Sequence, residues 1–488
     1  MCPRQINCYY FLKKIFFILI FIIIIYNLFT TINNLLQYSN IEYDKIIEKN
    51  SNEIYNVIKS ESKESYENEY LLSNEPFFTP IPGTEDIECS LYGKKKNGIV
   101  ARKYGFQRKK FKDKQDETLK MSCNAIKRRH FFPTKQHLTK EEETFPLAYS
   151  VIVFKNYYQL ELQLSLSYSI YNHYCFIIDS KAKKLFNKQL IKLGSCFENV
   201  YIMKKVLPFD SNGRNYANGH LECLQYLISK KWNYVFLLQN HDFPLKTNLQ
   251  LIKILKIYNG ASDFQMVPGY LERIDTFNDW SFTNLNIFKN YSKNYNEYGY
   301  PFWLNFVKGF SEVTLSRIDV DYMFHELNLT TLLHELDYPK HGIDEMFWST
   351  ILSDENINFP GGMPNYCTNY GKRVEYITRK SVWRTKRVCK SGLIRHGICI
   401  HGMEDFYKLN YYPHLFINKL MTEYDAGAVK CWSEILWNKR YANESNDILE
   451  EYYKGTPHVK WRKCKLSNTC SNDESLCDND IILDDWRL

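Results

Sequence analysis

The stretch AYSVIVFKNYYQLELQLSLSYSIYNHYCFIID, residues 148–179, decides the fold class of this chain. It opens with an apolar run rich in β-branched residues (148–154) and closes with a second apolar run (174–178). Residues 158–168 between them are apolar at helical intervals, so the stretch predicts a strand, a helix and a second strand. In such a βαβ unit the strand ends lie side by side, and Asp179 directly follows the second strand. The sequence therefore predicts an α/β protein with a nucleotide-binding crevice at this edge of its sheet.

The same alternation continues downstream. Val200–Met203 and Tyr234–Leu238 have the composition of strands, and His220–Ser229 between them has the spacing of a helix. Phe306–Leu315 and Glu345–Leu352 predict a later strand and a later helix. No internal repeat is visible, so we expect one large domain rather than a solenoid.

A long apolar run lies near the N-terminus. Ile15–Thr30 reads IFFILIFIIIIYNLFT, and a helix of roughly 18–22 residues here would be about 27–33 Å long, enough to cross a bilayer. Positive charge (Arg4, Lys13, Lys14) stands only on the N-terminal side, which predicts a cytosolic N-terminus. The alternative is a cleaved signal peptide, but no small-x-small cleavage site follows the run. The sequence predicts a type II signal anchor over residues 15–36.

Composition divides the chain into segments. It is 44% apolar and 24% charged, which argues against wholesale disorder or a fibrous repeat. Lys94–Lys135 holds 15 Lys and Arg against 3 Asp and Glu, an excess larger than the net +8 of the whole chain. A nucleic-acid surface spread over the protein is therefore not expected. The basic segment predicts either a solvated surface or attraction to acidic glycans or headgroups. The expected segments are a cytosolic tail 1–14, the anchor 15–36, a polar stem 37–88, a basic extension 89–145, the main domain 146–440 and a C-terminal tail 441–488.

Cysteines and sequons favour an oxidising compartment. Two of the 14 cysteines precede the anchor, and the 12 that follow it are an even number. Sequons at Asn290, Asn328 and Asn443 are glycosylation candidates only if this part of the chain enters the secretory lumen. Together with the anchor, these features predict a lumen-facing protein with disulfides.

Six segments together resemble the core-2/I-branching β-1,6-N-acetylglucosaminyltransferase family, which also includes the protein xylosyltransferases. The family's W-x-Y…D-F-P-L-K-T-N-L signature resembles WNYVFLLQNHDFPLKTNL here, and the other five segments follow the family order with similar gaps. The likeness covers roughly residues 123–436. The matching segments are Tyr149–Ser180, Cys196–Val200, Trp232–Leu249, Lys308–Arg317, Ile343–Thr350 and Arg395–Lys419.

The resemblance implies a GT-A-type fold, with a central mixed sheet flanked by helices and a single transmembrane helix before it. It implies a type II enzyme of the Golgi membrane whose catalytic domain lies in the lumen. The implied reaction is inverting transfer of N-acetylglucosamine from UDP-GlcNAc to a glycan or glycoprotein acceptor in β-1,6 linkage. Two alternatives stay open: a xylosyltransferase of the same family, and a catalytically inactive luminal glycan-binding relative.

An inverting transfer needs one general base beside the acceptor hydroxyl. The resemblance assigns this role to Glu345 of IDEMFWST, where Ile343 stands in place of the family's Pro. The sequence around Glu345 shows no nearby cation that would pair with it. The alternative interpretation is that Asp344 and Glu345 only stabilise the N-terminus of a helix.

The departing diphosphate needs positive charge. By resemblance Lys419 supplies part of it, and His396 falls at the family's arginine position while Arg395 stands one residue earlier. We expect Arg395 to serve, because a permanently charged guanidinium binds phosphate better than an imidazole. If His396 served instead, turnover should fall as the pH rises through about 6–7.

The remaining site residues also come from the resemblance. Ile152 and Asp179 are the expected contacts to the uridine end of the donor, and Gln265 and Arg273 are the expected contacts to the acceptor. The family uses side-chain cations where other GT-A enzymes use a metal, so neither an essential metal nor another cofactor is expected. Asp319-Val320-Asp321 has the Asp-x-Asp pattern of a metal site, but its context predicts the start of a helix.

The resemblance also implies four disulfides, which are Cys89–Cys431, Cys123–Cys196, Cys175–Cys223 and Cys389–Cys399. Four luminal cysteines remain outside that pattern: Cys367, Cys464, Cys470 and Cys477. An even remainder permits two more bridges, whose pairing is left open. A metal knuckle in the tail is the alternative, although an oxidising lumen favours bridges.

Overall fold

A computed structural model describes residues 75–93, 98–268, 271–337, 342–383, 389–442 and 445–479. They belong to one compact unit that begins at Glu75. The expected cytosolic tail, the anchor 15–36 and most of the stem lie outside the described residues. Within the described ranges, no helix is both long enough and apolar enough to cross a bilayer.

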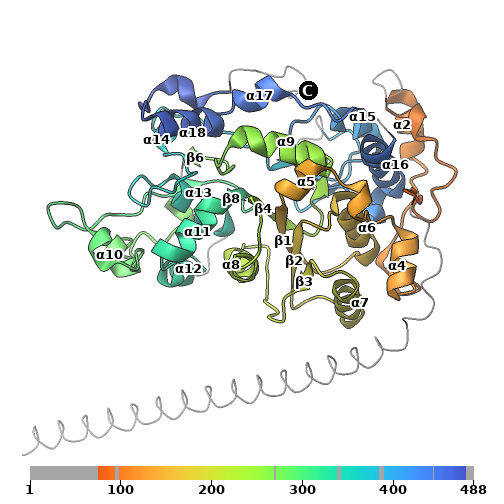
Figure 1. Cartoon of the computed structure of the whole chain (residues 1–488), viewed down its shortest axis with the longest axis horizontal. Helices are drawn as coiled ribbons and strands as arrows, with labels where there is room; N and C mark the ends of the chain where they lie inside the picture. The colour runs from red at the N-terminus through yellow and green to blue at the C-terminus, as the bar shows by residue number, and fades with distance from the viewer. Residues whose placement is uncertain are drawn as a thin grey trace, which may run out of the picture. The chain divides into compact units, whose positions relative to one another are not determined.

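A five-stranded mixed sheet forms the centre of this unit, in the order β3-β2-β1-β4-β8 (Figure 1). β1, β2, β3 and β4 run parallel, and β8 pairs antiparallel with β4. This confirms the predicted α/β class with a mixed sheet, and it fits the expected GT-A-type fold. The strands are β1 Leu147–Val153, β2 His173–Ile178, β3 Val200–Ile202, β4 Tyr234–Gln239 and β8 Thr314–Ser316.

Both faces of the sheet are covered, which explains why β1 is buried at every position and apolar at every position except Ser150. Ala148 and Ile152 point to one face, where they share a hydrophobic core with helix α8 and helix α13. Leu147, Tyr149 and Val151 point to the other face, where they pack with α6, α7 and α9. Alternation along the strand thus divides the core between two layers of helices.

Seventeen helices are present among the described residues, and several match the predicted positions closely. The predicted helices near residues 158–168, 220–229 and 345–352 correspond to α6, α8 and α13. The α-helices are α2 Gly98–Gly105, α3 Asp113–Asp116, α4 Cys123–Arg129, α5 Lys140–Thr144, α6 Tyr157–Ser167, α7 Lys184–Ser195, α8 Tyr216–Leu227, α9 Asn248–Tyr258, α10 Phe282–Leu285, α11 Arg317–Glu326, α12 Thr330–Leu336, α13 Asp344–Ser353, α14 Tyr366–Asn369, α15 Phe406–Leu409, α16 Thr422–Tyr441, α17 Glu450–Lys454 and α18 Pro457–Ser467. Short 3₁₀ helices lie at Cys89–Leu91, Lys135–His137, Leu271–Arg273, Tyr291–Asn294, Met403–Asp405 and Glu474–Cys477.

Three small sheets complete the fold around the ends of the central strands. β5 (Phe243–Pro244), β12 (Phe416–Asn418) and β9 (Arg379–Ser381) form a three-stranded sheet in the order β5-β12-β9. β10 (Ile394–Arg395) and β11 (Ile398–Cys399) form a hairpin. β6 and β7 form a two-stranded sheet, with bounds Val267–Pro268 and Val307–Lys308.

The expected strand over residues 306–315 is in fact two strands, β7 and β8, which belong to different sheets. Between them, Gly309 lies against Ser349 of α13 and the carbonyl oxygen of Gln265, where a Cβ atom would overlap both. The chain therefore approaches α13 closely at this glycine and leaves one sheet before it enters the next.

The basic extension packs against the main domain through a few of its residues, while nine of the twelve described Lys and Arg residues in Lys94–Lys135 are exposed, as expected for a solvated surface. Arg129 of α4 makes a two-pronged ion pair with Glu161 of α6, with nitrogen–oxygen distances of 2.7 and 2.8 Å. Arg108 contacts both Glu404 and Asp425, and the side chains of both arginines are only 13% exposed. The prediction of a solvated surface is wrong for these residues, because acidic partners from the main domain neutralise them.

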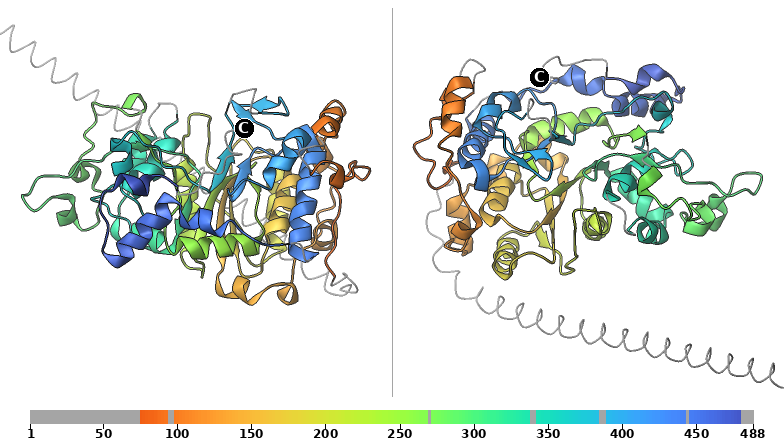
Figure 2. Two further views of the ribbon diagram at one scale, coloured as in Figure 1. Left: turned by 90° about the horizontal axis from the view of Figure 1, so that it is seen from above. Right: turned by 180° about the vertical axis from the view of Figure 1, so that it is seen from behind.

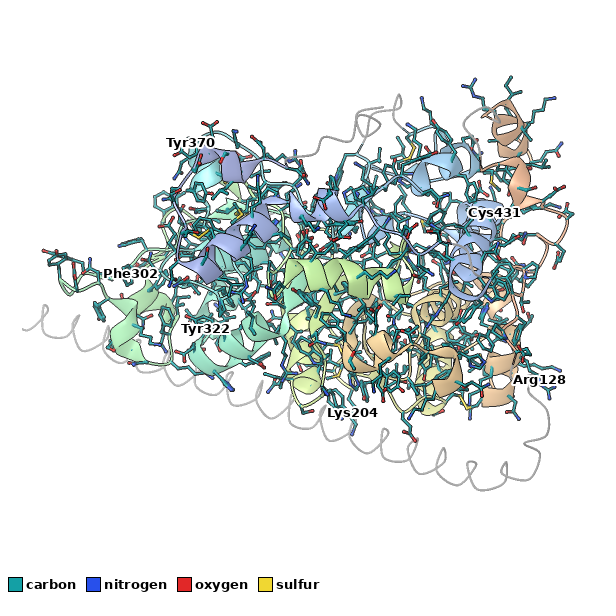
Figure 3. The ribbon with its side chains drawn as sticks, turned by 45° about the horizontal axis from the view of Figure 1, so that its top comes forward. Arg128, Lys204, Phe302, Tyr322, Tyr370 and Cys431 are labelled. Atoms are coloured by element: carbon teal, nitrogen blue, oxygen red, sulfur yellow. A yellow bond between two sulfur atoms is a disulfide. The ribbon has the colours of Figure 1, made fainter. Side chains whose placement is uncertain are left out.

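Six disulfides join the described cysteines. All four pairs implied by the resemblance are present, and Figure 3 labels Cys431 on α16, the partner of Cys89. In all three views of Figures 1 and 2 the orange N-terminal segment lies beside this blue helix. The two pairs that the sequence left open are Cys367–Cys477 and Cys464–Cys470.

The C-terminal region from residue 445 is packed rather than a loose tail. Tyr453 of α17 is buried, and its hydroxyl donates to the carbonyl oxygen of Pro413 at 2.7 Å. His458 and Trp461 of α18 are buried too. Tyr370, labelled in Figure 3, donates from its hydroxyl to the carbonyl oxygen of Asn472 at 3.1 Å.

The two tail disulfides should differ in their contribution to stability. Cys367–Cys477 spans 110 residues and Cys464–Cys470 spans 6. In the chain-entropy model, the disulfide that closes the longer loop stabilises the fold by about 5 kcal/mol, and the disulfide that closes the shorter loop by about 2 kcal/mol. Denaturant unfolding of the Cys367→Ser/Cys477→Ser and Cys464→Ser/Cys470→Ser variants measures this order, and a larger loss in the second variant would contradict it.

Two of the three sequons can be placed. Asn290 is exposed and Asn328 is half-buried, whereas Asn443 lies outside the described residues. The side-chain oxygen of Asn290 accepts a hydrogen bond from the hydroxyl of Ser292 in the same sequon, at 2.8 Å. Asn290 is thus the more accessible of the two for an attached glycan.

Candidate active site

A cavity of about 520 Å³ opens at the carboxyl ends of β1, β2 and β4, where the sequence predicts a nucleotide crevice. Ile152 near the end of β1, Asp179 after β2 and Gln239 at the end of β4 line it. Seven of the eight residues expected to bind or react line this cavity, and only Gln265 lies elsewhere. The seven are Ile152, Asp179, Arg273, Glu345, Arg395, His396 and Lys419.

One side of the cavity is strongly cationic. Lys419 follows β12, and its Nζ donates to the carbonyl oxygen of Arg395 at 3.2 Å. Nη1 of Arg395 lies 3.8 Å from Glu423 Oε1, which also accepts from Lys155 Nζ at 2.7 Å. Lys181 is a further lining residue and pairs with Asp179 at 2.5 Å. The arrangement gathers positive charge at one end of the crevice.

Arg395 and His396 occupy different parts of the β10–β11 hairpin. His396 and Gly397 are the two turn residues, with φ angles of 50° and 74°, as a type I′ turn requires. Arg395 is the last residue of β10 and pairs with Ile398 across the hairpin. Both side chains line the cavity, so the hairpin presents the arginine from a strand and the histidine from the turn.

The charges around His396 distinguish it from Arg395. Partial burial, together with the nearby positive charges of Lys419, Arg395, Lys181 and Lys155, lowers the pKa of His396 below its usual value. At neutral pH the imidazole is therefore uncharged, whereas the guanidinium of Arg395 keeps its charge. This favours Arg395 for contact with a diphosphate.

Lys419 is also affected by its surroundings. Burial, and then the positive charges of Arg395 and Arg379, lower the pKa of Lys419 to about 8, while Asp242 and Glu312 act in the opposite direction. The side chain is therefore mostly protonated at pH 7 and loses its charge just above that range.

A buried ionic network lies behind Lys419, and the sequence did not predict it. Arg379 Nη1 lies 2.5 Å from Glu312 Oε1 and 3.4 Å from Asp242 Oδ1. Asn418 Nδ2 donates to the same oxygen of Asp242 at 2.6 Å. Asp242 thus connects β9 and β12. Burial raises the pKa of Glu312 to about 8 despite the charge of Arg379.

Glu345 lies in the first turn of α13, and its side chain lines the cavity. Its role is therefore not limited to stabilising the N-terminus of the helix. The expectation that no cation lies near it is wrong. Glu345 Oε2 pairs with Arg273 Nη1 and lies 3.1 Å from Lys308 Nζ. Arg273 lies in the short 3₁₀ helix after β6, and Lys308 is the last residue of β7. Their ion pairs with Glu345 therefore arise from the tertiary fold.

The preceding residue, Asp344, is also a lining residue. Burial, and then the negative charge of Glu345, raise the pKa of Asp344 to about 6. The two carboxyl groups therefore differ in environment, because Glu345 has two cationic partners and Asp344 is beside a like charge.

Gln265 lies in a second cavity of about 730 Å³ that shares Phe310, Arg379 and Trp383 with the first. Gln265 Nε2 donates to Glu375 Oε2 at 2.9 Å, and the backbone carbonyl oxygen of Gln265 accepts from Ser349 Oγ at 2.8 Å. The two residues expected to bind the acceptor, Gln265 and Arg273, thus face adjoining cavities rather than one.

Two patterns that suggest metal binding have structural explanations. Asp319 lies in the first turn of α11, as predicted, and accepts from the backbone N–H of Gly361 at 2.6 Å and from Ser316 Oγ at 3.0 Å. Cys399, His401 and Asp405 bring possible ligand atoms within 4.8 Å of one another. However, Cys399 is joined to Cys389 and offers no thiolate.

Some lining residues could have been found from the sequence. Lys181 stands three residues after the end of the predicted second strand, where polar side chains enter the crevice of a parallel sheet. Arg379, Glu312 and Lys308 carry no such signal, because their partners lie far away in the chain.

Residues 147–410 match the family model described as Core-2/I-Branching enzyme. Among similar proteins is the "Beta-1,3-galactosyl-O-glycosyl-glycoprotein beta-1,6-N-acetylglucosaminyltransferase" of Bos taurus, 26% identical over 309 residues, or 60% of this chain and 70% of that protein. The Homo sapiens protein of the same name is 26% identical over 310 residues, with the same two shares. A Mus musculus protein with this name and the number 4 is 26% identical over 304 residues, or 59% of this chain and 65% of that protein.

Proposed function

Since the chain belongs to the Core-2/I-branching enzyme family and is a glycosyltransferase, we propose that it transfers N-acetylglucosamine from UDP-GlcNAc to a glycan acceptor in β-1,6 linkage. The observation that carries this proposal is the single cavity lined by Glu345, Asp179, Arg395 and Lys419. The family implies a nucleotide-sugar donor and a glycan acceptor. The names of the similar proteins support N-acetylglucosamine as the transferred sugar.

In the proposed reaction, the nucleoside end of the donor lies against Ile152 and Asp179, and Arg395 and Lys419 contact its diphosphate. The acceptor hydroxyl lies beside Glu345. Its oxygen attacks the anomeric carbon while Glu345 takes its proton, and the bond from that carbon to the diphosphate oxygen breaks with inversion. The electron pair leaves on UDP, whose added negative charge the two cations stabilise.

The ion pairs of Glu345 fit the task of a base that must be held in position. Arg273 and Lys308 approach the same oxygen, Oε2, which leaves Oε1 for the acceptor hydroxyl. A carboxylate fixed by two cations loses little conformational freedom when the acceptor binds. The same cations stand close to the acceptor, where they are able to donate to its hydroxyl groups.

We further propose that the enzyme is a single-pass type II protein of the Golgi membrane, with its catalytic domain in the lumen. The apolar run at residues 15–36 supports the anchor. Six disulfides among the described cysteines support an oxidising compartment. Fluorescence microscopy of the tagged full chain with a Golgi marker tests the location.

An assay of the purified full chain tests the reaction. With a disaccharide O-glycan acceptor, we expect acceptor-dependent UDP release from UDP-GlcNAc, and NMR of the product should show a new β-1,6 linkage. Preference for UDP-xylose would assign the chain to the xylosyl-transferring branch instead. Absence of turnover with both donors, together with no thermal shift on adding UDP, would identify an inactive relative.

Transfer should continue in excess EDTA. Arg395 and Lys419 supply the positive charge that other GT-A enzymes obtain from a bound metal, so chelation is expected to change the rate by less than about twofold. The measurement is UDP release with EDTA and then with added Mn²⁺. A rate that EDTA abolishes and Mn²⁺ restores would contradict the proposed role of these two side chains.

A further inference from the structure

The second cavity has one wall that lies beyond the family match. Residues 445–479 follow the matched residues 147–410, and this C-terminal segment packs against the main domain. The residues that it contributes to the cavity are Tyr452, Thr456, Pro457, Cys477, Asp478 and Asn479. The opposite wall comes from the matched region, including Gln265, Phe310 and Tyr376. The cavity is therefore completed by residues that lie outside the family match.

Covalent and ionic contacts hold this wall in place. The Cys367–Cys477 disulfide joins it to the first turn of α14, and Cys477 itself lines the cavity. Lys372 pairs with the next residue, Asp478, and lies 3.1 Å from Glu474. Lys460 Nζ donates to the carbonyl oxygen of Asp478 at 2.7 Å. Because this wall is already ordered, ligand binding does not have to order a loop, and the entropic cost of binding is lower.

The lining combines aromatic faces with planar polar groups. Phe310 and Tyr376 stack at 5.4 Å between ring centroids, and Trp383 is a further aromatic residue. Glu375 accepts from Gln265 at 2.9 Å and pairs with Arg373 at 2.8 Å. Flat apolar surfaces beside carboxylate, amide and guanidinium groups suit a sugar ring, which has an apolar C–H face and a rim of hydroxyl groups.

Four charged lining residues take part in ion pairs, which favours a neutral ligand, and Lys380 is a further charged residue of the lining. Arg373 is paired with Glu375, and Arg379 is paired with Glu312 and Asp242. Asp478 is paired with Lys372 on the wall. An acidic or a basic ligand would therefore have to compete with existing ion pairs, whereas hydroxyl groups can add hydrogen bonds to them.

The second cavity continues from the place where the acceptor hydroxyl must react. The two cavities share Phe310, Arg379 and Trp383. Gln265 is held by Ser349 of α13, the same helix that carries Glu345 at its start. With about 730 Å³ against about 520 Å³, the second cavity is the larger of the two and has room for more than one sugar residue.

We propose that the second cavity binds the sugar residues that extend from the reacting residue in a neutral oligosaccharide acceptor, and that segment 445–479 gives this enzyme a preference for extended glycans. This inference rests on the proposed function, since it deepens the specificity of the same site.

The test compares acceptors of different length. The full-length enzyme is assayed with a disaccharide acceptor, with the same disaccharide extended by three neutral sugars, and with the same disaccharide on a peptide. We expect KM for the extended glycan to be about tenfold lower than for the disaccharide, since two or three added hydrogen bonds and a ring contact would give this ratio.

Asp478→Trp fills the cavity with a bulky side chain, so the KM values for the disaccharide and the extended glycan should become nearly equal. Asp478→Ala removes one polar contact and should reduce the ratio of the two KM values about threefold. Glu474→Ala is the matched control, because Glu474 also pairs with Lys372 but does not line the cavity. The control should keep the wild-type ratio. Thermal unfolding of all variants checks that they fold, and the alanine variant carries the test if the tryptophan variant does not fold.

An equal KM for short and extended glycans in the wild type would overturn the inference, as would a ratio that Asp478→Trp leaves intact. A KM that is lower than for the disaccharide only with the peptide-linked acceptor would overturn the assignment of the cavity to a glycan. If no acceptor is glycosylated, the proposed function fails on its own. Saturation-transfer NMR with the extended oligosaccharide then decides the inference separately, since binding that Asp478→Trp abolishes supports it and absence of binding refutes it.

Discussion

Replacing Glu345 with glutamine is expected to lower kcat by about 10²–10⁴-fold, the usual contribution of a general base. Glutamine keeps the shape of the side chain and a carbonyl oxygen that accepts from Arg273, but it cannot take a proton. The donor site across the cavity contains none of the changed atoms. We therefore expect binding of UDP, measured by calorimetry, to stay within about twofold of the wild type.

The ion pairs make the experiment more specific. Arg273 and Lys308 both contact Glu345, so its replacement also removes the half-buried charge partner of these two cations. Lys308→Met, which leaves the base in place and removes one of its partners, should lower kcat by a smaller factor of about 3–30-fold, since it disturbs position but not proton transfer. Equal kcat values for wild type and Glu345→Gln would exclude Glu345 as the base.

Replacing Lys419 with alanine is expected to lower kcat/KM for the donor by about 10²–10³-fold, as loss of a charged group that stabilises a developing anion usually does. Lys419→Arg should keep more of the activity, because the charge remains although its geometry differs. Lys463→Ala, on the exposed surface of α18, is the control and should have the wild-type value.

The pH profile gives a second measurement of the same residue. Burial and neighbouring cations lower the pKa of Lys419 to about 8. Below that pH the donor-free enzyme carries the ammonium charge, and above it the charge is lost, so kcat/KM for the donor should fall as the pH rises through about 8. In Lys419→Arg this fall should be absent, because a guanidinium does not titrate in this range. A wild-type profile that is flat from pH 7 to 9 would contradict the role of Lys419.

The central sheet could be predicted because its strands carry their own signal. β1 and β2 are almost entirely apolar, with Ser150 and His173 as the exceptions, and burial on both faces favours that composition. β9 and β12 have only three residues each and include Arg379 and Asn418, so their sequence does not distinguish them from loops. Their pairing depends on contacts between distant parts of the chain.

The sequence predicted those site residues that belong to short motifs. The prediction failed for side chains whose role depends on a partner elsewhere in the chain. Glu345, Lys419 and Asp179 were each found from a motif and line one cavity. The cations around Glu345 were missed, because Lys308 and Arg273 meet it only through the tertiary fold. The same limit applies to the basic extension. Arg108 meets Asp425 across 317 residues of sequence, so charge composition, which indicates a largely exposed segment, could not reveal this ion pair.

The bridge between Cys89 and Cys431 determines how the enzyme could be shed from a membrane. A protease that cuts the chain on the N-terminal side of Cys89 separates the catalytic unit from the proposed anchor and releases it intact. A cut between Cys89 and Cys123 leaves the two pieces joined through Cys431, so the enzyme stays tethered until the bridge is reduced. The first residue of any secreted form of this protein should therefore lie on the N-terminal side of Cys89.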